Sequence, residues 1–220
     1  MKKYLLFWLS FVLMIATLYL IFLYVPPEKE MGIVQKIFYF MVPLGWLSML
    51  AFLIIFIGSI QYLRTKQSKW DVLSHASAEI GIVFTTLTLI TGSLWAKPTW
   101  GVWWDWGTPR LTSTLVLWFI YLAYFLVRSF ATEEYRGATF AAVVGIVGFV
   151  DIPIIVLATS LWRGMHPPMI IFKGDVAPQM MITLTVSIVA FTLFYVLLLK
   201  QRVAMKNAEI EIEMLREEHR

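Results

Sequence analysis

Long runs of apolar residues alternate along the chain with charged or Gly/Pro-rich stretches. A helix needs about 20 apolar residues to cross the hydrocarbon core of a bilayer, and six runs approach or exceed that length. The sequence therefore predicts an all-α integral membrane protein with six transmembrane helices. The expected spans are 4–25, 37–62, 72–95, 112–128, 138–161 and 178–199.

The first apolar run follows Lys2 and Lys3 and resembles a secretory signal peptide. It is longer than the apolar region of such a peptide, and it ends in Pro26, Pro27 and Glu28 without a small-residue cleavage site. We therefore interpret it as a retained first helix.

The basic residues are distributed unevenly between the two sides that six spans define. Twelve of the 18 fall on the side of the termini, and positive charge marks the cytoplasmic side of a membrane protein. This side carries Lys2, Lys3, Arg64, Lys66, Lys69, Arg128, Arg136, Lys200, Arg202, Lys206, Arg216 and Arg220. The other side carries Lys29, Lys36, Lys97, Arg110, Arg163 and Lys173. Both termini are therefore expected in the cytoplasm, and loops 26–36, 96–111 and 162–177 outside.

The composition agrees with a membrane protein, since 60% of the residues are hydrophobic and 15% are charged, against about 25% in soluble domains. The chain has no Cys, which excludes disulfides and thiolate metal sites. We expect a membrane domain over 1–199 and a cytoplasmic tail over 200–220. The tail alternates Glu with apolar residues and is expected to be helical, either as a solvated extension or as a docking helix for a partner.

Five of the ten Trp residues lie within twelve positions of a predicted outer loop, 95–113. They are Trp95, Trp100, Trp103, Trp104 and Trp106. The helix breakers Pro98, Gly101, Gly107 and Pro109 indicate an irregular loop rather than a helix face. Indole faces can stack on a planar apolar ligand, and Lys97 and Arg110 could pair with its carboxylates. The alternative is an aromatic belt in the headgroup region.

The stretches 92–98 (GSLWAKP), 100–106 (WGVWWDW) and 110–113 (RLTS) closely resemble the WWD signature of haem-handling proteins, in particular the CcmC (haem exporter protein C) family. The resemblance implies an outward-facing site in which haem b lies between this loop and two axial ligands. It further implies delivery of haem to the chaperone CcmE, beside the ATP-binding-cassette subunits CcmA, CcmB and CcmD, in the bacterial inner membrane.

Haem iron needs axial donors on the same side as the loop, and imidazole is the commonest. Of the three His residues, His75 and His219 are expected near or in the cytoplasm, so only His166 qualifies. It lies where the family has its second axial His, and Arg163 nearby is a candidate contact for a haem propionate.

Two positions depart from the family pattern. The other axial His is expected before a Val-Pro pair, where this chain has Met41. A thioether can ligate haem iron and raises its potential relative to two imidazoles; alternatively Met41 only packs, leaving the iron five-coordinate or bound by Met165 or water. The family also has an Asp just after the last Trp of the motif, whereas Asp105 precedes Trp106 here.

Two further groups carry charge within predicted spans. Asp151 is expected inside helix five, where burying a charge costs free energy. It is either a functional group or a structural polar contact. His75 and Glu79, four residues apart, are expected to pair near the cytoplasmic end of helix three.

The sequence contains no nucleophile or hydrolase motif, so we expect haem binding and transfer rather than catalysis. Covalent attachment of haem to the chaperone would then depend on positioning and on the redox state of the iron. One rival interpretation is a b-type electron-transfer subunit, but no second intramembrane His faces His75. Another is a secondary transporter, but Asp151 is almost alone as an intramembrane ionisable group.

Overall fold

The computed structural model describes residues 2–28, 31–131, 133–161 and 177–218. These ranges contain helices and no β-strand. The helices are α1 (Lys2–Tyr19) with a π-helical turn (Leu20–Tyr24), a 3-10 turn (Ile33–Ile37), α2 (Phe38–Thr65), α3 (Ser68–Trp100), α4 (Pro109–Ser129), α5 (Glu134–Gly148), α6 (Asp151–Leu161) and α7 (Pro178–Glu218).

Six helical segments are long and apolar enough to cross a membrane, which confirms the predicted fold class. They are Tyr4–Tyr24, Ile33–Thr65, Ser68–Trp100, Pro109–Ser129, Tyr135–Leu157 and Pro178–Glu218. Several extend beyond the predicted bounds, because polar residues continue a helix past the hydrocarbon core. Composition had located the apolar centres of these helices and not their ends.

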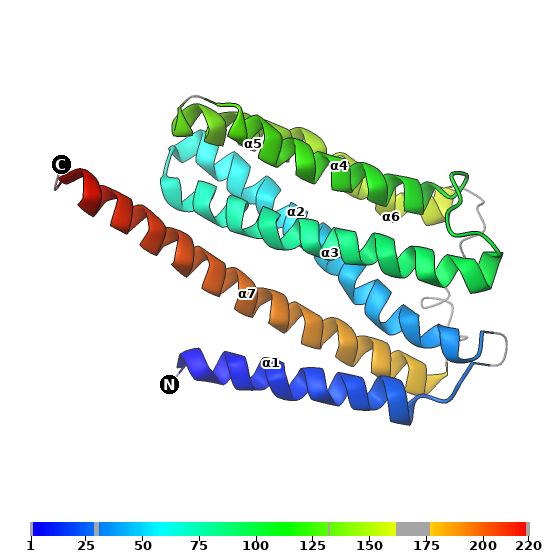
Figure 1. The fold of residues 1–220 in the computed structure, drawn as a ribbon. Coiled ribbons are helices and arrows are strands. Elements are labelled where there is room, and N and C mark those ends of the chain that lie inside the picture. Colours follow the sequence, from blue (N-terminus) through cyan, green and yellow to red (C-terminus); the bar gives the residue numbers. More distant parts are fainter. Residues whose placement is uncertain (1, 29–30, 132, 162–176, 219–220) are drawn as a thin grey trace.

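The helices form an elongated bundle with α2 and α3 at its centre (Figure 1). Helices α1 and α7 lie side by side against one flank, and α4, α5 and α6 cover the other. Both chain termini lie at one end of the bundle, which we call the terminal end. The connection from α3 to α4 lies at the opposite end, which we call the loop end.

The centre of the bundle is packed around buried aromatic residues. Phe52 and Tyr121 are fully buried and meet edge to face, with ring centroids 5.1 Å apart. The Tyr121 hydroxyl donates a hydrogen bond to the Ser48 carbonyl oxygen at 2.9 Å. A side chain at Gly81 would collide with the Tyr121 ring, so glycine is required there. This packing holds α2, α3 and α4 together at the centre of the bundle.

The fifth span, predicted over 138–161, is confirmed as an apolar span over Tyr135–Leu157. Its prediction as one continuous helix was wrong, because it divides into α5 and α6. The interruption falls at Phe149 and Val150. The ring of Pro153 would clash with the carbonyl of residue 149 in a continuous helix, which explains the position of the break. Asp151 therefore begins α6 rather than lying within a helix; it is 8% exposed, and its Oδ2 has no hydrogen-bond partner in the described ranges.

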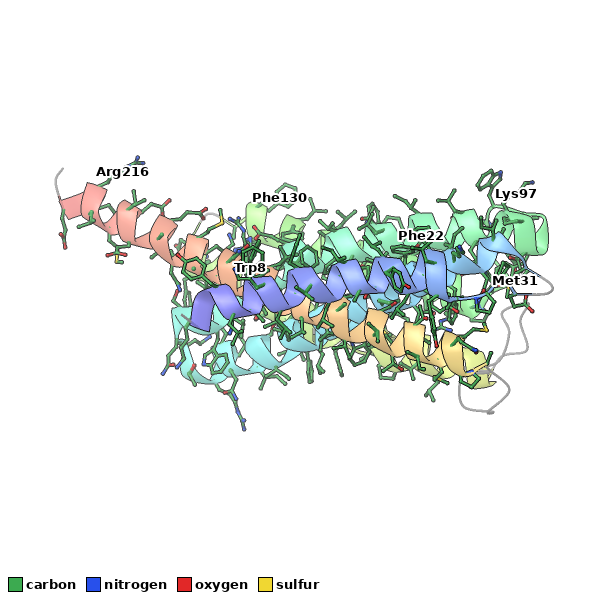
Figure 2. All side chains as sticks on the ribbon, turned by 90° about the horizontal axis from the view of Figure 1, so that it is seen from below. Trp8, Phe22, Met31, Lys97, Phe130 and Arg216 are labelled. Atoms are coloured by element: carbon green, nitrogen blue, oxygen red, sulfur yellow. The ribbon has the colours of Figure 1, made fainter. Side chains whose placement is uncertain are left out.

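Helix α7, in contrast, is continuous from Pro178 to Glu218, and residues 200–218 of the tail prolong it. Its interior contains no Gly or Pro to interrupt the hydrogen-bond ladder. Figure 2 shows this helix projecting beyond the rest of the bundle, with Arg216 far out at the terminal end.

Candidate functional site

Helix α3 carries the first two tryptophans of the cluster to the loop end. Trp95 is 4% exposed and meets Trp100 edge to face, with ring centroids 5.3 Å apart. The expectation that Pro98 breaks the helix was wrong, since α3 continues to Trp100. The helix ends at Gly101, whose φ of 78° costs glycine little.

Three tryptophans occupy the connection between α3 and α4. Trp103 and Trp106 are 57% and 71% exposed. Trp104 is half-buried and meets Trp106 with ring centroids 5.6 Å apart. Lys97 donates a hydrogen bond to the Gly101 carbonyl oxygen at 2.9 Å, and its ammonium lies 5.9 Å from the centre of the Trp103 ring. The loop thus presents indole faces and one cation at the surface.

Asp105 stabilises the last residues of this loop, just before α4. Its carboxylate accepts hydrogen bonds from the Gly107 N–H at 3.1 Å and from the Thr108 hydroxyl at 2.5 Å. Thr108 is the residue before α4, and Pro109 is the first residue of that helix, a position where proline is favoured. Asp105 therefore contributes to the loop's conformation through its own segment, and no cation of the described residues pairs with it.

Two donors on the same segment have no acceptor among the residues that the structure describes. The Trp104 indole N–H is buried without one. The half-buried Arg110 guanidinium forms no hydrogen bond or ion pair within the described ranges. Elsewhere in the bundle the indole N–H groups of Trp46 and Trp118 donate to threonine hydroxyls, at 3.3 Å and 2.9 Å. Buried donors are normally satisfied, so these two groups are candidate contacts for the acceptors of a ligand.

The first turn of α2 brings Met41 to the same end of the bundle. Its sulfur lies against α3, 4.0 Å from the position that a Cβ on Gly92 would occupy. The same position is 3.5 Å from Leu111 Cδ2 on α4. Met41 therefore points between α3 and α4, below the loop that joins them, and it is half-buried there.

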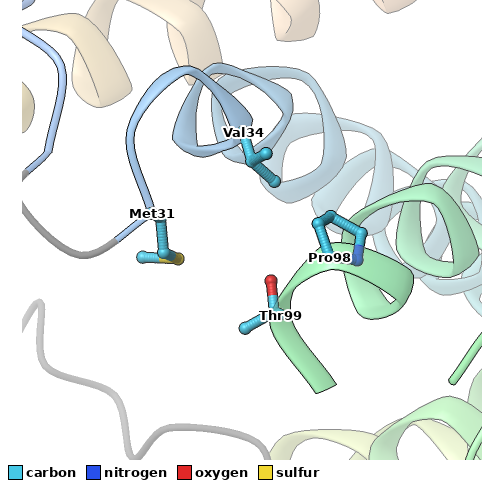
Figure 3. A pocket seen from close by; sticks show the side chains of 4 residues that line it. All are labelled: Met31, Val34, Pro98 and Thr99. Carbon is cyan, nitrogen blue, oxygen red and sulfur yellow. The ribbon is translucent and has the colours of Figure 1, made fainter. Parts of the chain in front are cut away.

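A cavity of about 240 Å³ opens beside this region (Figure 3). Met31 and Val34 line it from the segment before α2, and Pro98 and Thr99 line it from the last turn of α3. Figure 2 places Met31 and Lys97 at this same end of the molecule. The loop end thus combines a cavity, indole faces and a thioether.

The remaining predicted site residues, His166 and Arg163, lie outside the described residues, as does the alternative ligand Met165. The other predicted members are distributed over the loop end. The structure brings Trp95 and Trp100 together, and likewise Trp104 and Trp106, while Asp105 is engaged in its own turn.

The terminal end carries a network of polar contacts around Glu79. His75 and Glu79 form the expected pair, with Nε2 and Oε1 3.2 Å apart. Glu79 also accepts two hydrogen bonds from Arg202, at 2.5 Å and 2.9 Å, and lies 3.3 Å from the Lys206 ammonium. Sequence reasoning missed these contacts with α7. The only signal was the spacing of two basic residues, four apart, at the start of the tail.

A second pair that the sequence did not reveal joins α3 to α4. Asp71 accepts two hydrogen bonds from Arg128, each at 2.6 Å. Both side chains are mostly buried, with exposures of 11% for Asp71 and 17% for Arg128. This two-point contact fixes the two helices at the terminal end.

The fold and the loop end define a class, that of a multi-pass helical membrane protein with a candidate ligand site at one end of its bundle. The family model CcmC, heme exporter protein C, matches residues 2–218. The chain is 36% identical over 185 residues to the heme exporter protein C of Bradyrhizobium diazoefficiens, covering 83% of this chain and 69% of that protein.

The heme exporter protein C of Escherichia coli K12 is 30% identical over 193 residues, which cover 88% of this chain and 78% of that protein. A putative cytochrome c biosynthesis ccmC-like mitochondrial protein of Marchantia polymorpha is 36% identical over 143 residues, which cover 65% of this chain and 60% of that protein. The chain belongs to the heme exporter protein C family, whose members handle haem for cytochrome c biogenesis.

Proposed function

We propose that this chain binds haem b at the loop end and passes it to the haem chaperone CcmE during cytochrome c maturation, in the bacterial inner membrane and beside CcmA, CcmB and CcmD. Its role is binding and transfer rather than catalysis. One observation carries the proposal: the WWD-like loop has open indole faces. It also contains a buried indole N–H, and Arg110 follows it; neither group has an acceptor among the residues that the structure describes.

These groups fit the chemistry of haem. Trp103 and Trp106 offer flat apolar faces on which a porphyrin can stack. Arg110 and the Trp104 N–H are donors for the two propionates, and a guanidinium is suited to bind a carboxylate at two points. Lys97 already contacts Trp103 and adds positive charge beside the faces. Each group would hold the ligand or orient it, and none needs to react.

The iron that haem brings accepts two axial donors and changes oxidation state. We assign these donors to His166 and Met41, with Arg163 as a further propionate contact. Imidazole is the stronger donor, and a thioether raises the reduction potential relative to a second imidazole. A Met41→His variant should therefore bind haem with a bis-imidazole absorption spectrum and a lower potential.

Haem titration of the purified protein tests the proposal most directly. Replacing Trp103, Trp104 and Trp106 together by Ala should remove haem binding, because the stacking faces are lost. The helices should still insert, since these side chains lie outside the packed centre of the bundle. Haem content unchanged in this variant would show that the loop is an interfacial belt, and a wild-type protein that takes up no haem would overturn the proposal.

The proposal also requires the loop end to face away from the cytoplasm. Reporter fusions after Lys69, Arg136 and Arg220 should be active in the cytoplasm, as the excess of basic residues at the terminal end indicates. Fusions within 96–111 or 162–177 should be active on the outer side. Cytoplasmic signals from both groups would contradict the outward placement of the tryptophan loop.

A further inference from the structure

One face of α7 carries a row of residues whose spacing alternates regularly between three and four positions. This is the heptad spacing by which two helices pack alongside one another. All members of the row are apolar except Ser187 and Gln201. We call this row the seam, and it consists of Leu184, Ser187, Phe191, Phe194, Leu198, Gln201, Met205, Ala208, Ile212 and Leu215.

The first part of the seam is covered by other helices of this chain. Leu184 is 4% exposed and belongs to one packed cluster with Tyr39 of α2. Phe191 is 8% exposed and packs in another cluster with Leu47 of α2 and Phe84 of α3. Inside the bundle, the seam therefore packs against neighbouring helices, as its spacing predicts.

A groove marks the place where this cover becomes incomplete. It has a volume of about 270 Å³ and lies between α3 and α7, near the terminal end. Its apolar lining comes from Ile80, Val83 and Phe84 of α3 and from Leu198 and Met205 of α7. Val83 and Met205 are more than half exposed. A groove of this kind receives large apolar side chains from a neighbouring helix, as knobs enter holes.

Beyond the groove, the seam continues into the projecting part of α7 (Figure 2). Met205 and Ile212 are 56% and 50% exposed there, and Ala208 between them is exposed as well. The spacing is unchanged, although the helices that cover the first part of the seam do not follow α7 outward. An exposed apolar row with heptad spacing favours a helix from another chain as its cover.

The charge of the tail restricts what that cover can be. Residues 207–218 contain five Glu and one Arg, a net charge of −4. This charge disfavours contact with the anionic surface of the cytoplasmic leaflet, and it disfavours pairing with the same tail of a second copy. A partner with basic residues beside its apolar ones is attracted instead.

We propose that the groove and the seam from Leu198 to Ile212 form one docking surface for a transmembrane helix of another protein, whose cytoplasmic extension is basic. The cytoplasmic ends of transmembrane helices are rich in Lys and Arg. Such a helix brings apolar side chains to the groove and positive charge to the acidic tail. The inference goes beyond haem binding and rests on the proposed function only for the cytoplasmic placement of the tail.

The test uses the absence of Cys from the chain, because a single introduced Cys can carry a photo-crosslinker at a chosen position. Met205→Cys lies on the seam. Met214→Cys is the matched control, since nine residues are about two and a half turns and place it on the opposite face. The two Met side chains are 56% and 54% exposed, so the label has similar access to both positions.

Full-length Met205→Cys is crosslinked in membranes of the cells in which the protein naturally occurs. We expect a product with another membrane protein, and mass spectrometry should place the crosslink where an apolar span continues into a segment rich in Lys and Arg. Met214→Cys should lose most of this product.

A pair of charge reversals tests the electrostatic part of the proposal. Glu211 lies beside Ile212 at the edge of the seam, whereas Glu217 lies on the opposite side of the helix. In the Met205→Cys chain, Glu211→Lys should reduce the yield of the product several-fold, because it places like charges together. Glu217→Lys should change it little. Both replacements exchange one good helix former for another, so the tail stays helical.

Several results would overturn the inference: no product, a product between two copies of this chain, equal yields from the two Cys positions, a crosslinked segment without basic residues, or an unchanged yield in Glu211→Lys. A reporter after Arg220 that is active on the outer side would overturn it together with the proposed orientation. A wild-type protein that takes up no haem overturns the proposed function and leaves the docking surface intact.

Discussion

The two ends of the bundle differ in how their polar groups are satisfied. At the terminal end, Asp71 pairs with Arg128 through two hydrogen bonds, and Glu79 accepts from Arg202. These pairs join α3 to α4 and to α7. At the loop end, the Arg110 guanidinium has no carboxylate and the Trp104 N–H has no acceptor among the described residues.

The difference lies in the partners that the described residues supply for charged groups. Removing charges from water costs free energy unless a partner compensates for it, and the terminal end supplies its partners from its own helices. Among the described residues the loop end supplies donors and aromatic faces, and the proposed haem would bring acceptors for them. We therefore expect substitutions at the terminal end to affect folding and those at the loop end to affect binding.

The largest effect is expected at the buried pair. Asp71→Ala should lower the free energy of unfolding by about 3–5 kcal/mol, because it leaves the Arg128 guanidinium, 17% exposed, without its carboxylate. Reversible unfolding in mixed micelles measures this change. Glu133→Gln removes an exposed pair with Arg136, with exposures of 60% and 63%, and should have no measurable effect. Equal losses in the two variants would contradict the comparison.

Arg110→Ala should give the opposite result. Because Arg110 forms no ion pair with the described part of the chain, the free energy of unfolding of the haem-free protein should change by less than about 1 kcal/mol. Haem binding should weaken roughly tenfold, since hydrogen bonds to charged groups contribute about 1.5–3 kcal/mol. Titration and unfolding of the same preparations measure both quantities. Arg110→Lys, which retains the charge, should bind better than Arg110→Ala; a severe loss of stability would show that Arg110 is structural.

The smallest effect compares two half-buried tryptophans. Trp118→Phe removes an indole N–H that donates to the Thr86 hydroxyl at 2.9 Å, and it should cost about 1 kcal/mol more stability than Trp104→Phe. The Trp104 N–H has no acceptor to lose among the residues that the structure describes. Only Trp104→Phe should weaken haem binding. If haem binding weakened in Trp118→Phe and stayed unchanged in Trp104→Phe, the placement of Trp104 in the haem site would be wrong.

Much of the fold could be predicted from the sequence, because a bilayer imposes a minimum length of apolar helix. The six spans follow from that requirement. The interruption before Asp151 was not predicted, although Pro153 explains it afterwards, since proline-containing helices in membranes often continue. At Pro98 the error has the opposite sense, because the proline was expected to break the helix and α3 continues through it.

The candidate site could be predicted less completely. Sequence identified the tryptophan loop and the positions of Met41 and Arg110, because motif and resemblance are local. The contact between Glu79 and Arg202 joins residues 123 positions apart, and no periodicity specifies it. The burial of the Trp104 N–H, which has no acceptor among the described residues, is likewise a property of packing that no local motif specifies.

The uninterrupted length of α7 has a mechanical consequence. A helix of 41 residues is about 60 Å long, roughly twice the thickness of the hydrocarbon core. Its first residue lies at the loop end and its last extends beyond the terminal end (Figures 1 and 2). Because no hinge separates these points, a rotation or tilt applied to the tail on one side of the membrane is transmitted as a rigid-body displacement to the other side.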